Sequence, residues 1–292
     1  MDLATETQMT YQPPVLSAGV KRHVETRAIT FSISSLQRQR VRFWLAAKTL
    51  ARTGIIVVRG AATPEVVATL AGMAETTWNT VSDLAPGQIL PNVIINRDQE
   101  RVLKGYKSLV ESNKPVINVR YGEDEGMMDV FHPEHLCPER KQLVIGSLHE
   151  ALIRKLAEKA FGKALEVKCR NLYLNRGVTN TRFYHSDGER IKVKSFVYLD
   201  DVGSLDIGPY CYIKNSHRDG RLRRHNQSFN DKHGLNKHEY RLLSGRAALP
   251  IFCRAGDMVV SAQHGAHRGH PQMPSAHRAV LVNVYEPTKG KD

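Results

Sequence analysis

The sequence predicts a mainly β protein of the α+β class, in which antiparallel strands form a barrel or sandwich and helices from the N-terminal half pack on it. Two observations predict this class. From residue 165 onward, short apolar β segments alternate with turns at spacings typical of an antiparallel barrel or sandwich. Before that point, the clearest apolar patterns have helical spacing. The simplest organisation is a single domain over 1–292, comprising an N-terminal arm at 1–28, a helical part at 29–162 and a β-barrel core at 163–286.

The first predicted helix covers residues 36–54 and leads directly into a strand. Gly54 is suited to cap the C-terminal end of this helix. Residues 55–60 (IIVVRG) form a short apolar run that predicts a buried strand. Helical spacing places four apolar side chains near the face expected to meet the core: Val41, Trp44, Leu45 and Leu50.

Two further helices are predicted before the β segments begin. Residues 63–78 start with Thr63 as N-cap and Pro64 at the first helical position, where the missing N–H of proline costs nothing. Residues 138–162 carry the strongest amphipathic pattern in the chain. This third helix is expected to end at Gly162, and lysines near its C-terminus complement the helix dipole.

The stretch between the second and third helices is mixed in character. It contains two short apolar runs, VII at 93–95 and PVINV at 115–119. The segment 124–136 (DEGMMDVFHPEHL) is expected to be a packed connector rather than a lid. Its histidines, His132 and His135, are near neighbours without an evident third ligand, so we expect them at the surface.

The composition, with 41% hydrophobic and 24% charged residues, indicates a folded protein rather than a disordered one. No stretch approaches the roughly 20 apolar residues that span a bilayer, so no membrane association is expected. The N-terminus lacks the basic flank and apolar run of a secretory signal. The four cysteines form no CxxC pair, which removes support for a zinc ribbon or a redox motif. A cytoplasmic protein with free thiols is expected.

A His-x-Asp motif, in YHSDG, supplies two candidate metal ligands. On an extended strand, residues i and i+2 point to the same side, so His185 and Asp187 can direct an imidazole nitrogen and a carboxylate oxygen to one point. A third ligand is expected from residues 256–271 (GDMVVSAQHGAHRGHP), where a predicted strand ends among histidines. Two histidines and one carboxylate form the ligand set of Fe(II) enzymes that activate O₂. A surface histidine beside a solvated aspartate explains the motif about equally well in isolation.

Arg278 opens the last predicted strand, eleven positions after His267. A hairpin return places it on the strand antiparallel to the one that ends in His267. A guanidinium inside an otherwise apolar barrel mouth needs a partner, and a carboxylate can accept two parallel hydrogen bonds from it. A metal beside such an arginine predicts a dicarboxylate co-substrate that chelates the metal.

The chain also resembles a known family. The segments that carry the resemblance are YHSDG, KVKSFVYLDDV, GPYCYIKNSH and GDMVVSAQHGAHRGHP, followed by the late arginine. They are similar, in this order, to the phytanoyl-CoA dioxygenase-like branch of the 2-oxoglutarate/Fe(II) oxygenases. The resemblance covers roughly 165–286, and residues 54–70 are similar to the family's N-terminal strand and helix. One departure is Asn215, which stands where the family has glycine in a Gly-Ser-His turn; asparagine tolerates the left-handed conformation.

This resemblance implies a double-stranded β-helix core (jelly-roll, cupin-like) with the N-terminal helices packed on it. It implies Arg278 as the group that binds the C5 carboxylate of 2-oxoglutarate, with contacts to this co-substrate from Lys194 and Tyr173. The implied reaction consumes O₂ and 2-oxoglutarate, releases succinate and CO₂, and hydroxylates or desaturates a small organic substrate. Three residues are implied as ligands of Fe(II): His185, Asp187 and His267.

The third ligand has rivals nearby in the sequence. His264 and His270 flank His267, and His277 adjoins the arginine. We favour His267 because its spacing to Arg278 and the Arg-Gly that follows it fit the family. The other histidines are expected at the rim or as groups that orient the ligands. The family's halogenases lack the motif's carboxylate, so its presence here favours hydroxylation or desaturation.

A basic insertion is predicted at 214–246, between two barrel strands near the mouth of the site. The net charge of the chain is +13, and this insertion holds nine Lys or Arg against three acidic residues. It could be a rim that attracts an anionic substrate, or a solvated loop that only aids solubility. Its few aromatics, Phe229 and Tyr240, disfavour nucleic acid binding, which relies on base stacking. The nine basic residues are Lys214, Arg218, Arg221, Arg223, Arg224, Lys232, Lys237, Arg241 and Arg246.

Two other function classes stay open at this point. A non-oxidative metal-binding β-barrel, such as a cupin-type isomerase or binding protein, often uses three or four histidines and needs no equivalent of Arg278. A nucleic-acid-binding protein, or an oxygenase directed at nucleic acid, would show steeply salt-dependent binding to a polyanion. No feature of the sequence indicates an oligomeric state.

Overall fold

The structure is a computed structural model that describes residues 26–85, 88, 90, 92–97, 114–243 and 247–288. Twelve strands are found among these residues. The strands are β1 (Thr30–Ser32), β2 (Ile55–Arg59), β3 (Ile94–Asn96), β4 (Val116–Val119), β5 (Met127–Phe131), β6 (Leu165–Arg176), β7 (Val193–Tyr198), β8 (Tyr210–Tyr212), β9 (Leu249–Ile251), β10 (Met258–Ala262), β11 (His267–Gly269) and β12 (His277–Pro287).

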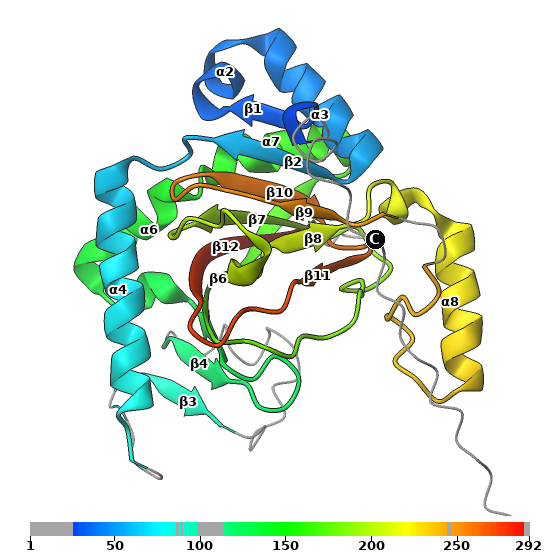
Figure 1. The fold of residues 1–292 in the computed structure, drawn as a ribbon. Helices are drawn as coiled ribbons and strands as arrows, with labels where there is room; N and C mark the ends of the chain where they lie inside the picture. The colour runs from blue at the N-terminus through cyan, green and yellow to red at the C-terminus, as the bar shows by residue number, and fades with distance from the viewer. Residues whose placement is uncertain are drawn as a thin grey trace, which may run out of the picture.

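These strands form two sheets (Figure 1). The larger sheet has the order β1-β2-β10-β7-β12-β6-β5-β4-β3, and the smaller sheet has the order β11-β8-β9. The centre of the large sheet is antiparallel, and β12 pairs with β6 along its whole length, with one register shift between Val284 and Tyr285. Parallel pairs occur at both edges, between β1 and β2 and between β3 and β4. The large sheet is therefore mixed.

Helices cover one face of the large sheet, and the small sheet covers the other. The helices are α2 (Ile33–Arg38), α3 (Arg40–Thr53), α4 (Pro64–Ser82), α6 (Lys141–Ser147), α7 (Glu150–Phe161) and α8 (Gly220–Lys232), with short 3-10 turns η1 (Pro133–His135), η2 (Pro138–Arg140), η3 (Leu205–Ile207) and η4 (Ser216–Arg218). Figure 1 shows α4 along one side of the sheets, α8 on the other side, and α2 and α3 at the end near β1.

Alternation along β2 shows how both faces of the large sheet are buried. Ile56 and Val58 belong to the core beneath the helices, while Ile55 and Val57 belong to the core between the two sheets. Successive side chains of a strand point to opposite faces, so a strand buried on both sides is a continuous apolar run. This explains the run IIVV, and the strand predicted at 55–60 is confirmed.

The helix predicted at 36–54 is correct in its end but wrong in its continuity and its buried face. Gln39 is extended and separates α2 from α3, and Gly54 caps α3 in the left-handed conformation. Val41 is 70% exposed, and Trp44 and Leu45 are also exposed. The face of α3 that carries small side chains is buried, because these side chains let α3 lie close to α7. The buried residues of α3 are Ala46, Ala47, Leu50 and Thr53.

The second predicted helix is confirmed, and the third is interrupted. Thr63 caps α4 by accepting a hydrogen bond from the Val66 N–H, and the helix runs past the predicted end at 78. The segment 138–162 is divided into η2, α6 and α7, and His149, in the left-handed conformation with φ 46°, separates α6 from α7. Gly162 caps the last of these helices as expected.

The description of 29–162 as a helical part is incomplete, because this part also supplies β1 to β5. Short apolar runs such as those at 93–95 and 115–119 become edge strands, whose partners are distant in the sequence. The segment 124–136 is a connector only in its last residues, since β5 pairs with β6. The arm at 1–28 lies outside the described residues up to residue 25. Among the described residues, no helix has the length and apolar character that a membrane span requires.

Candidate metal centre

His185, Asp187 and His267 lie together at the mouth between the two sheets. His185 pairs with His267 through an isolated antiparallel bridge, with N–H to oxygen distances of 2.9 and 3.0 Å. The Asp187 N–H donates to the Gln263 carbonyl at 2.8 Å. These backbone bonds fix two segments, about eighty residues apart in the chain, in one register. One ligand atom from each side chain lies within 4.8 Å of the other two.

Each imidazole is oriented by a backbone carbonyl. The Nδ1 of His185 bonds to the Phe183 carbonyl at 2.8 Å, and the Nδ1 of His267 bonds to the Gly265 carbonyl at 2.9 Å. An N–H at Nδ1 leaves Nε2 with the lone pair that a metal needs. Burial lowers the pKa of His267 to about 4 and that of His185 well below its usual range. Both rings are therefore neutral at pH 7.

The two carboxylate oxygens of Asp187 have different neighbours. Oδ1 lies 3.8 Å from the Nε2 of His185 and 3.7 Å from the Nε2 of His267. Oδ2 accepts from the Lys194 ammonium at 2.7 Å. Burial raises the pKa of Asp187, but the charge and the hydrogen bond of the Lys194 ammonium outweigh it and hold the pKa below its ordinary value. A carboxylate that is ionised and oriented in this way is a suitable metal ligand.

Arg278 lies in the same cavity and makes no ion pair among the described residues. One of its Nη atoms donates to the Gly208 carbonyl, and its buried Nε has no hydrogen-bond partner. Burial lowers the pKa of this guanidinium from its ordinary value. Tyr198, Tyr210 and Val280 line the cavity with it. An unpaired guanidinium beside apolar and aromatic side chains is suited to a carboxylate ligand.

The cavity that holds these groups has a volume of about 460 Å³. Its other cationic side chains have carboxylate partners. Arg120 bonds Asp124 and Asp129 at 2.8 and 2.7 Å, and Arg182 bonds Asp124 at 2.7 Å. Lys192 pairs with Glu286, and Lys194 with Asp187. Arg278 is thus the cationic group of this wall for which the described residues offer no carboxylate at ion-pair distance.

All six residues singled out by sequence reasoning line this cavity. The structure places the Lys194 ammonium on Asp187, with the Tyr173 hydroxyl 3.5 Å away. The rival histidines lie outside the three-ligand group. His264 packs against Phe161 and His217, and His277 is exposed near Asp200. The third rival, His270, lines the cavity and bonds the Pro271 carbonyl.

The basic insertion is not the loop that the sequence suggested. Its centre is α8, which begins at Asp219, whose side chain accepts from the Leu222 N–H. Among the described residues of the insertion, those that line the cavity are Asn236, His238 and Glu239, and none of its Lys or Arg does so. Arg241 turns to Glu239 and lies over the Phe183 ring. Arg246 lies outside the described residues.

Several cavity residues were missed by sequence reasoning because no local motif marks them. Gln263 donates to the Tyr210 hydroxyl at 3.1 Å, and this hydroxyl also bonds Ser261 at 2.9 Å. The paired group of Arg120 and Asp129 reaches the cavity from β4 and β5, far from the His-x-Asp motif. Only the pairing of distant strands brings these polar side chains to one wall.

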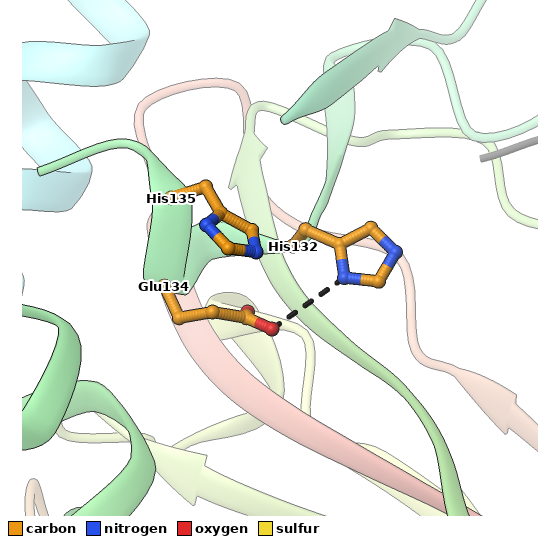
Figure 2. A group of neighbouring side chains, drawn as sticks. All are labelled: His132, Glu134 and His135. Atoms are coloured by element: carbon orange, nitrogen blue, oxygen red, sulfur yellow. Dashed lines mark hydrogen bonds and ion pairs between the residues drawn. The ribbon is translucent and has the colours of Figure 1, made fainter. Parts of the chain in front are cut away.

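The expectation that His132 and His135 are surface residues without a third ligand is wrong. Both are half-buried, and with the buried Glu134 they form a second group whose ligand atoms lie within 4.8 Å of one another (Figure 2). The third ligand escaped notice because it stands between the two histidines. A left-handed residue followed by a 3-10 turn brings all three side chains together.

Comparison with known proteins places the fold. No family model matches the chain, and no curated protein matches it. Among solved structures, the chain is similar to the epimerase SnoN in complex with Fe³⁺, alpha-ketoglutarate (2-oxoglutarate) and nogalamycin RO, with a TM-score of 0.52, 16% identity and coverage of 87% of this chain and 84% of that one. It is also similar to SnoK, a non-haem, alpha-ketoglutarate-dependent carbocyclase from nogalamycin biosynthesis, with a TM-score of 0.53, 17% identity and 82% of each chain covered.

A third similar structure is HygX from Streptomyces hygroscopicus with nickel and 2-oxoglutarate bound. The TM-score is 0.50, the identity is 14%, and the match covers 82% of this chain and 84% of that one. The large mixed sheet is therefore a fold shared with non-haem, 2-oxoglutarate-dependent enzymes. Identity this low establishes the fold and leaves the chemistry to be argued from the residues of this chain.

Proposed function

We propose that this protein is an Fe(II)- and 2-oxoglutarate-dependent dioxygenase that acts on a small organic substrate. The observation that carries the proposal is the presence, in one cavity, of two kinds of site. One is a group of two imidazoles and one carboxylate, His185, His267 and Asp187, and the other is the unpaired guanidinium of Arg278. A metal would bind to the first site. A dicarboxylate co-substrate would bind to that metal through one end and to Arg278 through the other.

The fold supports this proposal through the order of its strands. The centre of the large sheet runs β6-β12-β7-β10. In the small sheet, β9, β8 and β11 are followed by the bridge from His267 to His185. Apart from the paired strands β8 and β9, consecutive segments thus alternate between the two sheets, as in the winding of a double-stranded β-helix. Together with the motifs from His185 to Arg278, this winding supports a place in the phytanoyl-CoA dioxygenase-like branch.

The residues present fit the metal that this function requires. His185, His267 and Asp187 would hold Fe(II) on one face and leave positions for the co-substrate and O₂. When bound, the iron supplies the activation of O₂ with 2-oxoglutarate as the electron donor. Burial keeps both imidazoles neutral, and the Phe183 and Gly265 carbonyls orient them so that Nε2 carries the lone pair. Arg278 would bind the remote carboxylate and so fix how the co-substrate lies in the cavity.

Hydroxylation or desaturation is the outcome we propose for the substrate. Asp187 occupies the position that halide would need, and this favours both outcomes over halogenation. The net charge of +13 supports an anionic substrate. A non-oxidative β-barrel has no evident use for Arg278, which supports an oxidative function over that alternative.

Reconstitution with Fe(II) tests the function directly. The purified protein, with Fe(II), 2-oxoglutarate and O₂, should release succinate in step with O₂ consumption. Binding of 2-oxoglutarate under anaerobic conditions should require the metal. His185→Ala and Asp187→Ala should abolish both readouts. Metal-independent binding of 2-oxoglutarate, or full succinate release by either variant, would overturn the assignment.

A further inference from the structure

We propose that His132, Glu134 and His135 form a second metal site, suited to Zn²⁺ and separate from the site at Asp187. The site lies where β5 ends and η1 begins (Figure 2). It lines a different cavity, of about 410 Å³. The sequence suggested a histidine pair without a third ligand, and the structure supplies that ligand in Glu134.

Local backbone geometry brings the two imidazoles together. His132 adopts the left-handed conformation, with φ 57° and ψ 52°, an uncommon one for a residue other than glycine. The His135 N–H then donates to the His132 carbonyl at 3.0 Å, which closes a 3-10 turn. Residues three apart in such a turn lie above one another. The ring centroids are 6.1 Å apart, and the rings are tilted by 50°.

Two buried polar atoms here have no hydrogen-bond partner among the described residues, the Oε2 of Glu134 and the Nε2 of His132. The Nε2 of His132 points away from the other two ligands in Figure 2, so the unsatisfied atom of the ligand group is the Oε2 of Glu134, a residue only 4% exposed. Buried polar groups are usually satisfied, and an unsatisfied one calls for a ligand. In Figure 2 the Glu134 carboxylate lies beneath both rings, with one oxygen bonded to the Nδ1 of His132 at 3.5 Å.

Arg170 holds the glutamate in place from the neighbouring strand. Its guanidinium bonds Glu134 at 3.0 Å and Glu150 at 2.7 Å. Two carboxylates thus share one guanidinium, which leaves negative charge next to the histidines for a cation. This arrangement is typical of metal sites, in which an outer group orients a ligating carboxylate.

The ligand set suits a divalent transition metal, as the set of the same type at Asp187 does. Two imidazole nitrogens and one carboxylate oxygen suit Zn²⁺, which takes a water as fourth ligand when the protein supplies three. Ligands at about 2.1 Å from a tetrahedral ion lie roughly 3.4 Å apart. The three atoms here lie within 4.8 Å of one another, so the side chains would have to move closer to bind the ion.

Metal at this site would fix the turn that follows β5, because all three ligands come from residues 132–135. The backbone already joins this turn to β6, since the His132 N–H donates to the Arg170 carbonyl at 2.9 Å. The adjacent residues, Phe131 and Asn171, line the larger cavity described above. The second ion would therefore have a structural role, in stabilising the turn next to a wall of the candidate active site.

The test uses tag-free full-length protein that carries His185→Ala and Asp187→Ala, so that the first site contributes no metal. Zn²⁺ titrated into this parent should bind at about one equivalent per chain and raise its melting temperature. Further substitution of Glu134→Gln or His135→Ala should remove that equivalent and the zinc-dependent shift in melting temperature. His225→Ala, at an exposed position on α8, is the matched histidine control and should keep both.

Each outcome bears on the proposal independently of the proposed oxygenase function, because the readout is metal content in a protein without the first site. The absence of zinc binding by the parent would overturn it. So would an undiminished equivalent in the His135→Ala protein. Melting curves in the presence of a chelator show whether each variant is folded. If Glu134→Gln alone is folded, its zinc content decides the matter.

Discussion

Lys194 holds Asp187 through the carboxylate oxygen that the histidines do not face. Its ammonium lies 2.7 Å from Oδ2, while Oδ1 lies 3.7 Å from His267 Nε2 and 3.8 Å from His185 Nε2. Lys194 therefore occupies the Oδ2 of Asp187 and leaves Oδ1 available to a metal. Lys194 positions a ligand, in addition to any contact with a co-substrate.

Removing the ammonium should weaken the metal site without emptying it. Lys194→Met should lower Fe(II) affinity by about 10-fold or more, because outer groups that orient ligands are typically worth 10–100-fold. It should also raise the pKa of Asp187, so metal binding should be lost at a higher pH than in the wild type. Anaerobic Fe(II) titrations over a range of pH measure both effects.

Lys192→Met is the matched control for this experiment. Lys192 lines the same cavity two residues away, but it pairs with Glu286 at 3.1 Å. Its loss removes the same charge from the wall and leaves the partner of Asp187 in place. If the two variants lose metal affinity equally, general electrostatics rather than orientation explains the effect.

Arg278 should control binding of the co-substrate rather than of the metal. Arg278→Met removes the guanidinium that has no carboxylate partner among the described residues, so 2-oxoglutarate should bind about 100-fold more weakly, as expected for loss of a buried charge-assisted pair worth roughly 3 kcal/mol. Fe(II) affinity should change little. Calorimetry with the iron-loaded protein under anaerobic conditions measures the first quantity, and metal titration measures the second.

Arg176→Gln provides the comparison for that variant. Arg176 lies on the strand paired with β12, but its side chain is directed to Glu75 and stacks near Trp78. Binding of 2-oxoglutarate should be unchanged in this protein. Equal weakening in both variants would mean that the co-substrate responds to net charge and not to the guanidinium in the cavity.

Features encoded by neighbouring residues were predictable from the sequence. The left-handed cap at Gly54 and the N-cap at Thr63 depend on one or two residues each. His185 and Asp187 reach one ligand group as predicted, although His185 lies in an isolated β-bridge and Asp187 in a bend rather than on a regular strand. These predictions hold because the physical cause lies within a few positions of the residue concerned.

Features set by distant partners were not predictable in this way. The buried face of α3 is chosen by how closely Ala46 and Ala47 can approach α7, and no period within the helix reveals that choice. The sequence alone does not show whether Lys194 contacts a co-substrate or Asp187, because that depends on the register of the strands. Glu134 completes a ligand set only because His132 takes the left-handed conformation.

Gly265 should be a position where one methyl group disturbs both stability and the metal site. A Cβ at this residue would collide with the Tyr212 hydroxyl, which donates to the Ala262 carbonyl. Overpacking of this kind costs about 1–3 kcal/mol. Because the Gly265 carbonyl orients His267, Gly265→Ala should lower Fe(II) affinity as well as the free energy of unfolding. Urea denaturation and metal titration measure the two effects.

Gly72→Ala is the contrasting substitution. Gly72 lies in the interior of α4, and a Cβ there would meet no atom within 4 Å. Alanine should therefore increase the free energy of unfolding by about 0.5–1 kcal/mol, because glycine in a helix loses more conformational entropy on folding. If both glycine variants shifted stability in the same direction, close packing at Gly265 would not be the cause.

His264 should make the protein sensitive to acid. Burial, together with the nearby His217 and Arg223, lowers the pKa of His264 to about 4. The unfolded chain takes up a proton near pH 6.5, whereas the folded protein does so only near pH 4, so stability is lost as the pH falls between these values. The free energy of unfolding of His264→Gln, which takes up no proton, should fall by about 1–2 kcal/mol less than that of the wild type between pH 7.5 and pH 5.

Urea denaturation of metal-free protein at both pH values measures the difference. His225→Gln, on the exposed face of α8, is the control and should behave as the wild type does. Equal losses in all three proteins would show that His264 does not stay neutral in the folded state.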